Sequence, residues 1–204
     1  MRHRSTLFAR LAIALTLAAS LAACADQRSP TETTTPLPTT AGLTKGDAGP
    51  SHAGGIVAHD ACEPNSFNAG IGEGTCVKHG NVTLDEFVAE LSATKTVQRW
   101  NFTPLQLTAR LGVDVLGNNV GGEEHTFTPV KQFGGGVVDF LNALTGTPVK
   151  AQECLTLDED DLVASGGKYL IEAGELEDVV DGSGIARVQC CIHPWMRATV
   201  RMQR

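Results

Sequence analysis

The sequence predicts an all-β domain of the sandwich or barrel type, preceded by a long N-terminal segment that lies outside the fold. From residue 97 onward, short runs alternate apolar and polar residues, which is typical of half-buried strands. Gly, Asn and Pro separate these runs, and no internal repeat is present. The composition of residues 1–58 differs from this pattern and does not predict a folded segment. About 145 residues therefore remain for folding, which is the usual size of one domain.

Residues 1–23 are expected to be a signal peptide. Three arginines precede the apolar run LAIALTLAASLAA, and small residues follow it. This run is too short to span a bilayer comfortably. The motif LAAC at residues 21–24 resembles the bacterial lipobox, in which the cysteine is lipidated, so Cys24 is the predicted lipidation site. The alternative is an ordinary signal peptide cleaved near Ala23.

Residues 24–58 are expected to be a lipidated flexible linker. They are rich in Thr, Pro, Ala, Ser and Gly and hold almost no large apolar residue, so they cannot bury enough surface to offset chain entropy. A lipid anchor with a tether predicts an exported protein held at a bacterial membrane, on its periplasmic or cell-surface side.

The charge of the chain narrows the classes of partner. Removing residues 1–23 removes three arginines and no acid, so the formal charge changes from −7 to −10. Such an acidic domain argues against nucleic acid as a partner. The sequence also lacks a nucleophile elbow, a phosphate-binding loop and a zinc-protease helix. We therefore expect neither an enzyme nor a small-molecule substrate.

Residues 59–96 are expected to form an N-terminal extension with a disulfide and a short helix. Cys62 and Cys76 bracket a glycine-rich loop and most simply pair with each other in an oxidising compartment. Thr83 and Glu86 have the spacing of a capping box, which opens a helix over VTLDEFVAELSATK. Phe87 and Leu91 lie on one face of that helix and are expected in the core.

Residues 97–204 carry the predicted strands. Alternating runs occur at 97–103 and 105–111, around Val113 and Val115 before a turn at Gly117-Asn118, and at 168–173, 185–190 and 197–202. The stretch 128–164 is less regular. Within it, FGGGVVDFLNAL predicts a glycine hinge and a short helix, and LTLDEDDLV predicts an acidic surface loop.

The stretch QCCIHPWM, residues 189–196, concentrates potential metal ligands. Cys190, His193 and Met196 follow one another at the spacing Cys-x-x-His-x-x-Met, and a second histidine, His125, lies upstream in NNVGGEEHTF. Cys, His and Met together suit a copper ion. Each residue also has an ordinary structural interpretation: His125 as a strand-end histidine, Met196 as core, and one of the two adjacent cysteines as half of a disulfide.

These two motifs resemble those of the cupredoxins, the small blue-copper proteins of the plastocyanin and amicyanin type. The resemblance covers about residues 97–204, and the short Cys–His–Met loop with Pro after His is most similar to amicyanin. It implies a Greek-key β-sandwich with one type 1 copper. It also implies that His125, Cys190 and His193 are the equatorial ligands and Met196 the weak axial one.

The resemblance also separates the two adjacent cysteines. Cys190 has the family spacing to His193, and neighbouring strand residues point to opposite faces, so Cys191 points away from the metal. Cys191 is then free to pair with Cys154. With Cys24 lipidated, five cysteines remain, which two disulfides and one metal thiolate account for.

The expected function is electron transfer between redox partner proteins at the membrane surface. The edge of His193 would pass the electron, and Pro194 with Trp195 would form an apolar docking rim. There are two alternative functions for this chain. It could be a copper-binding lipoprotein for storage or delivery, or a metal-free interaction domain in which Cys190 is oxidised. Glu123 and Glu124 could orient His125, although solvent exposure is their default.

Overall fold

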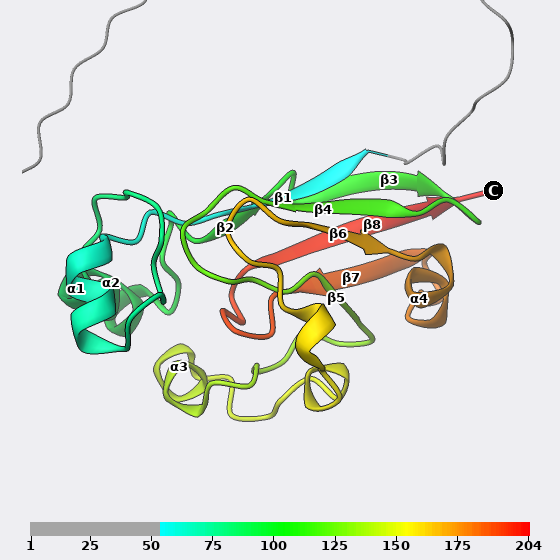
Figure 1. The fold of residues 1–204 in the computed structure, drawn as a ribbon. Helices are drawn as coiled ribbons and strands as arrows, with labels where there is room; N and C mark the ends of the chain where they lie inside the picture. Colours follow the sequence, from blue (N-terminus) through cyan, green and yellow to red (C-terminus); the bar gives the residue numbers. More distant parts are fainter. Residues whose placement is uncertain (1–53) are drawn as a thin grey trace, which may run out of the picture. The chain divides into compact units, whose positions relative to one another are not determined.

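Two four-stranded β-sheets form the framework of residues 54–204, the part of the chain that this computed structural model describes (Figure 1). The first sheet has the order β2 (Asn101–Thr103), β1 (Gly55–His59), β4 (Val115–Asn119), β6 (Lys168–Ile171). The second has the order β3 (Gln106–Arg110), β8 (Arg197–Gln203), β7 (Ile185–Gln189), β5 (Thr128–Val130). The predicted all-β class is confirmed in part: the described residues are mainly β, but they also hold four α-helices.

The two sheets share one apolar core. Alternate residues of β1, β4, β7 and β8 are buried, as a sheet with one covered face requires. Phe102 on β2 stacks on Phe127, with ring centroids 5.2 Å apart. Each sheet mixes strand directions, because β1 pairs parallel with β4 and β3 pairs parallel with β8.

Strand β1 corrects the predicted domain boundaries. Residues 24–58 were expected to be linker and residues 97–204 to hold the whole sandwich, yet Gly55–His59 forms a strand between β2 and β4. Ile56 and Ala58 are fully buried and provide the reason for its place there. The predicted signal peptide, Cys24 and the linker up to residue 53 lie outside the described residues.

Strand β4 corrects the turn expected at Gly117-Asn118. Both residues lie within β4, which continues to Asn119. Gly117 is needed there for packing, because a Cβ atom would lie 2.6 Å from the ring of Phe127. The strand expected over 97–103 is also shorter than predicted, since β2 begins only at Asn101.

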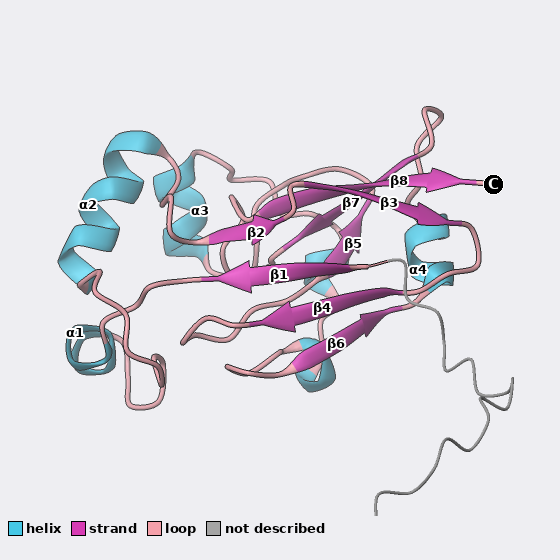
Figure 2. Cartoon of the chain, turned by 90° about the horizontal axis from the view of Figure 1, so that it is seen from above, coloured by secondary structure: helices cyan, strands magenta, loops and turns pink. Residues whose placement is uncertain are grey.

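Four α-helices and two 3-10 turns complete the fold of residues 54–204, and Figure 2 shows α1, α2 and α3 at one end of the sheets and α4 at the other. Their bounds are α1 Pro64–Gly70, α2 Leu84–Thr94, α3 Asp139–Thr145 and α4 Ala173–Asp178, with the 3-10 turns at Glu153–Leu155 and Glu159–Asp161. None of the helices within 54–204 has the length and apolarity needed to cross a membrane.

The helices follow local capping signals to different degrees. Helix α2 has the predicted capping box between Thr83 and Glu86, and Phe87 and Leu91 are buried as expected. Helix α3 matches the predicted short helix. Helix α1 replaces part of the predicted loop, because the Glu63 carboxylate accepts hydrogen bonds from two N–H groups of its first turn and Pro64 occupies the first position. Helix α4 was not predicted.

Candidate metal centre

The loop between β7 and β8 folds into a tight turn around the thiol of Cys190. The Cys190 N–H donates to the carbonyl of Met196 over 3.0 Å, and the Met196 N–H donates to the carbonyl of His193 over 2.9 Å. The Cys190 Sγ accepts from the backbone N–H of His193 at 3.4 Å and of Thr126 at 3.5 Å. These bonds fix the sulfur beside the chain that carries His125.

Two imidazoles and one thiol converge at this point. The Nδ1 atoms of His125 and His193 lie 3.7 and 3.9 Å from Cys190 Sγ. All three potential ligand atoms lie within 4.8 Å of one another, and the three residues are buried. His125 is held in place by two backbone hydrogen bonds with Val163, of 3.1 and 2.8 Å. The fold thus closes a gap of 65 residues between His125 and Cys190.

This donor set suits copper. Two imidazole nitrogens and one thiolate are the in-plane ligands of a type 1 copper site, whose weak axial ligand is commonly a methionine. Met196 is buried within the same turn. Another cluster, Asp60, Cys62 and Glu123, does not form a metal site, because Cys62 is in a disulfide.

The two adjacent cysteines have separate roles in the structure. Cys191 forms a disulfide with Cys154, whereas Cys190 is the one free cysteine of residues 54–204. A second disulfide joins Cys62 to Cys76. Cys190 therefore keeps its thiol, which is the requirement for a metal ligand.

Electrostatics favours the thiolate form of Cys190. Burial opposes ionisation, but hydrogen bonding and charge attraction from His125 and His193 outweigh it and hold the pKa of this thiol well below its usual range. Burial likewise disfavours the charged form of His125, yet Asp60 and Cys190 together raise the pKa of this imidazole to about 9. The metal-free centre is therefore a thiolate–imidazolium pair.

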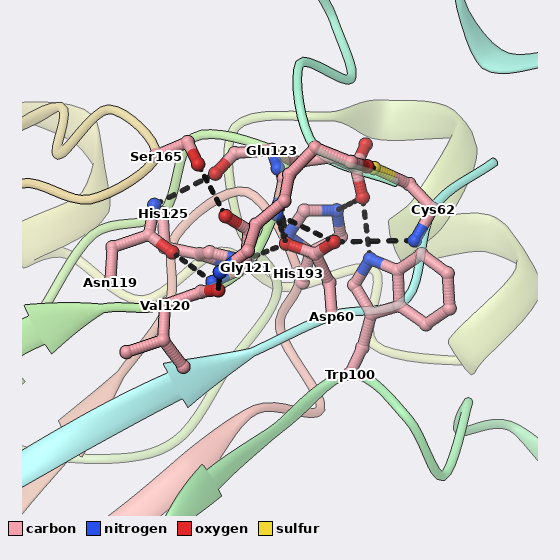
Figure 3. Close-up of polar contacts among 12 residues, drawn as sticks. Asp60, Cys62, Trp100, Asn119, Val120, Gly121, Glu123, His125, Ser165 and His193 are labelled. Carbon is pink, nitrogen blue, oxygen red and sulfur yellow. Dashed lines mark hydrogen bonds and ion pairs between the residues drawn. The ribbon is translucent and has the colours of Figure 1, made fainter. Parts of the chain in front are cut away.

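Buried carboxylates lie behind both histidines (Figure 3). Asp60 Oδ2 is 3.0 Å from His125 Nε2, and Glu123 Oε2 is 3.6 Å from His193 Nε2. Glu123 also accepts a hydrogen bond of 2.5 Å from the indole N–H of Trp100. The contacts of Asp60 hold its pKa below the usual range despite burial, whereas burial raises the pKa of Glu123.

Sequence reasoning placed Glu123 wrongly and missed Asp60. Glu123 is buried and lies against His193, not His125, while Glu124 is exposed as expected. Asp60 is 65 positions from His125, and no spacing rule links the two. The only indication in the sequence was local. Asp60 directly follows GIVAH, whose alternate residues are buried in strand β1, so the position of Asp60 is fixed by the end of that strand.

The ring of His193, which was expected to pass the electron, is covered by other side chains. His193 is 3% exposed, and the rings of Phe87 on α2 and Trp195 pack against it at centroid distances of 6.4 and 5.5 Å. Pro194 is buried and Trp195 half-buried, so of these two residues only Trp195 has exposed surface for the predicted docking rim. Phe87 of α2 also packs against the ring of Trp195, at a centroid distance of 5.8 Å.

Comparison with solved structures returns cupredoxins. The chain is similar to a purple cupredoxin from Nitrosopumilus maritimus, with 15% identity over 52% of this chain and 86% of that one, at a TM-score of 0.34. It is also similar to plastocyanin from Dryopteris crassirhizoma (18% identity, 51% and 89% coverage, TM-score 0.31). A further similar structure is amicyanin from Paracoccus versutus (13% identity, 53% and 77% coverage, TM-score 0.30).

Neither protein-family models nor curated protein sequences give a match to this chain. At such low identities and TM-scores, function has to be inferred from the geometry of the site.

Proposed function

We propose that this protein is a type 1 copper protein that carries electrons between redox partner proteins, built on a cupredoxin-like Greek-key sandwich. One observation supports it most: two imidazole Nδ1 atoms and one free thiol from distant segments converge in a buried site. Lipidation at Cys24 and attachment to a bacterial membrane complete the proposal. They rest on the LAAC motif and the linker composition.

The chain's residues would hold the metal in a geometry that changes little between oxidation states. A bound copper supplies reversible one-electron exchange between its two common oxidation states. His125, Cys190 and His193 are each fixed by hydrogen bonds, and the Cys154–Cys191 disulfide anchors the residue next to Cys190. A site that is already ordered needs little rearrangement when the charge changes, which favours electron transfer.

The covered position of His193 favours a second candidate, copper storage. Electrons entering or leaving through His193 would have to cross the side chains of Phe87 and Trp195. The same cover hinders copper from leaving, as a storage protein requires. The third alternative, a metal-free domain with Cys190 oxidised, finds less support, because Cys190 is a free thiol with Cys191 already paired.

The decisive experiment loads the exported domain with Cu(II) and measures copper stoichiometry together with the visible spectrum. The proposal expects one copper per chain and an intense thiolate-to-copper band. A colourless protein with full copper occupancy would contradict it. Storage is distinguished by kinetics: slow electron self-exchange combined with slow loss of Cu(I) to a chelator identifies a storage protein. Mass spectrometry showing Cys190 in a disulfide would identify the metal-free domain.

A further inference from the structure

Asp60 is a buried charged residue with a fixed set of partners. Its side chain is fully shielded from solvent and lies 3.0 Å from His125 Nε2. Its two carboxylate oxygens also accept hydrogen bonds from the backbone N–H groups of Cys62, Gly122 and Glu123, over 2.8–3.3 Å. Five short contacts leave this carboxylate one position, so the ring of His125 is held by a rigid acceptor.

Glu123 occupies the equivalent place behind His193. Its side chain is 7% exposed and lies 3.6 Å from His193 Nε2. Trp100 fixes it from the other side by an indole hydrogen bond of 2.5 Å. Trp100 is itself buried and stacks on Phe67 of α1 at a centroid distance of 5.8 Å. The position of Glu123 therefore depends on the helical layer at this end of the molecule.

A carboxylate at Nε2 has two physical effects on a ligand imidazole. It fixes the ring with the Nε2–H toward the carboxylate and leaves the Nδ1 lone pair for the metal. It also places negative charge near the metal in a region of low dielectric, where charge interactions are strong. Negative charge stabilises the more highly charged Cu(II) state over Cu(I), which lowers the reduction potential.

We propose that Asp60 and Glu123 are positioning residues of the metal centre, which orient His125 and His193 through Nε2, and that the charge of Asp60 lowers the reduction potential of the bound copper. This inference rests on the proposed copper function. It assigns a role to the N-terminal segment, because Asp60 follows β1 and because Trp100, which holds Glu123, stacks on Phe67 of α1. Residues outside the predicted copper domain of 97–204 would thus take part in the centre.

The test compares Asp60→Asn and Glu123→Gln with Glu124→Gln. Asp60→Asn removes a buried charge, and Glu123→Gln replaces a buried carboxyl group; both keep a hydrogen-bond acceptor, while the control removes an exposed charge at the adjacent position. We expect both buried variants to keep the visible band, and Asp60→Asn to raise the ratio of Cu(I) to Cu(II) affinity at least roughly tenfold. For one electron this is an upward shift of about 59 mV in reduction potential. The control should shift much less.

The outcomes separate the two proposals. A wild-type protein without a thiolate–copper band overturns both. A coloured wild type whose Asp60→Asn variant shifts in potential no more than Glu124→Gln overturns this inference and leaves the proposed function standing.

Wild-type protein gives a further test if the variants do not fold. In the diamagnetic Cu(I) form, nuclear magnetic resonance should show ring Nε2–H protons of His125 and His193 that exchange slowly with solvent. Rapid exchange of both protons would overturn the inference.

Discussion

Cys190 and Cys191 show that the role of a cysteine depends on the direction in which its side chain points. The two are neighbours at the end of β7, and both are fully buried. Although β7 ends at Gln189, the two side chains point apart: Cys190 lies against the histidines, and Cys191 lies against Cys154 in a separate apolar cluster with Val130 and Ala151. One residue is therefore available for a metal, and the other stabilises the chain around it.

Replacing the two cysteines singly should have opposite effects. Cys190→Ser removes the thiolate ligand, so we expect the copper band to vanish while the fold remains. Cys191→Ser breaks the disulfide with Cys154, so we expect the band to remain and the free energy of unfolding to fall. Visible spectra and urea unfolding of both variants check this. A reversal of the two effects would mean that Cys191 is the ligand.

The metal-free protein should hold Cys190 as a thiolate at neutral pH. A lowered pKa means that the charged form persists as the pH falls, until the pH drops through the shifted value. We expect ultraviolet thiolate absorbance at pH 7 that Cys190→Ser lacks. An absorbance that appears only above about pH 8.5, the range of an ordinary cysteine, would contradict the thiolate–imidazolium pair.

Helix α2 is the element that separates this site from solvent. The sequence predicted both its capping box and its apolar face. It did not predict which residues this face covers, because Phe87 contacts His193 and Trp195, which lie about a hundred positions further along the chain. The helix therefore limits how closely another molecule can approach the centre.

Removing the ring of Phe87 should open the site. We expect Phe87→Ala to lower the free energy of unfolding by about 3–5 kcal/mol and to speed electron self-exchange, because the cover over His193 is lost. Leu91→Ala, on the same buried face of α2, is the matched control and should cost about 2–5 kcal/mol without changing self-exchange. Line broadening in mixtures of oxidised and reduced protein measures the rate. Equal rates in both variants would show that Phe87 is not the barrier.

At the scale of the whole molecule, strand β1 ties the N-terminal segment to the sandwich. It pairs with β2 and β4, and the chain then passes directly to Asp60 and to the Cys62–Cys76 disulfide. The second disulfide ties the stretch before the acidic loop to the end of β7. Both cross-links lie within the described residues: one begins two positions after Asp60, and the other holds the residue that directly follows Cys190.

The disulfide with the longer loop should contribute more stability. The cysteine pairs are separated by 37 residues for Cys154–Cys191 and by 14 for Cys62–Cys76. Loop-closure entropy then predicts losses of about 4 and about 3 kcal/mol when each pair is replaced by alanines. Denaturant unfolding measures both losses. Loss of the copper band in a folded Cys154→Ala, Cys191→Ala variant would contradict the assignment of Cys190 as the ligand.

The sequence by itself determined the features that depend on neighbouring residues. Strand alternation, the capping box at Thr83 and the order of Cys190, His193 and Met196 are local patterns, and they predicted a mainly β chain with a clustered donor set. The turn at Gly117-Asn118 failed, because a glycine that looks like a turn signal serves to admit the ring of Phe127.

Only the tertiary structure decided which distant residues surround the candidate centre. Asp60 behind His125, Glu123 behind His193 and Phe87 over His193 come from separate segments. No local pattern encodes such contacts, because they arise when packing of both sheets and the helical end brings remote side chains into one buried volume. Short sequence motifs therefore predict the candidate metal ligands, whereas the fold determines which side chains cover the site and which charged groups surround it.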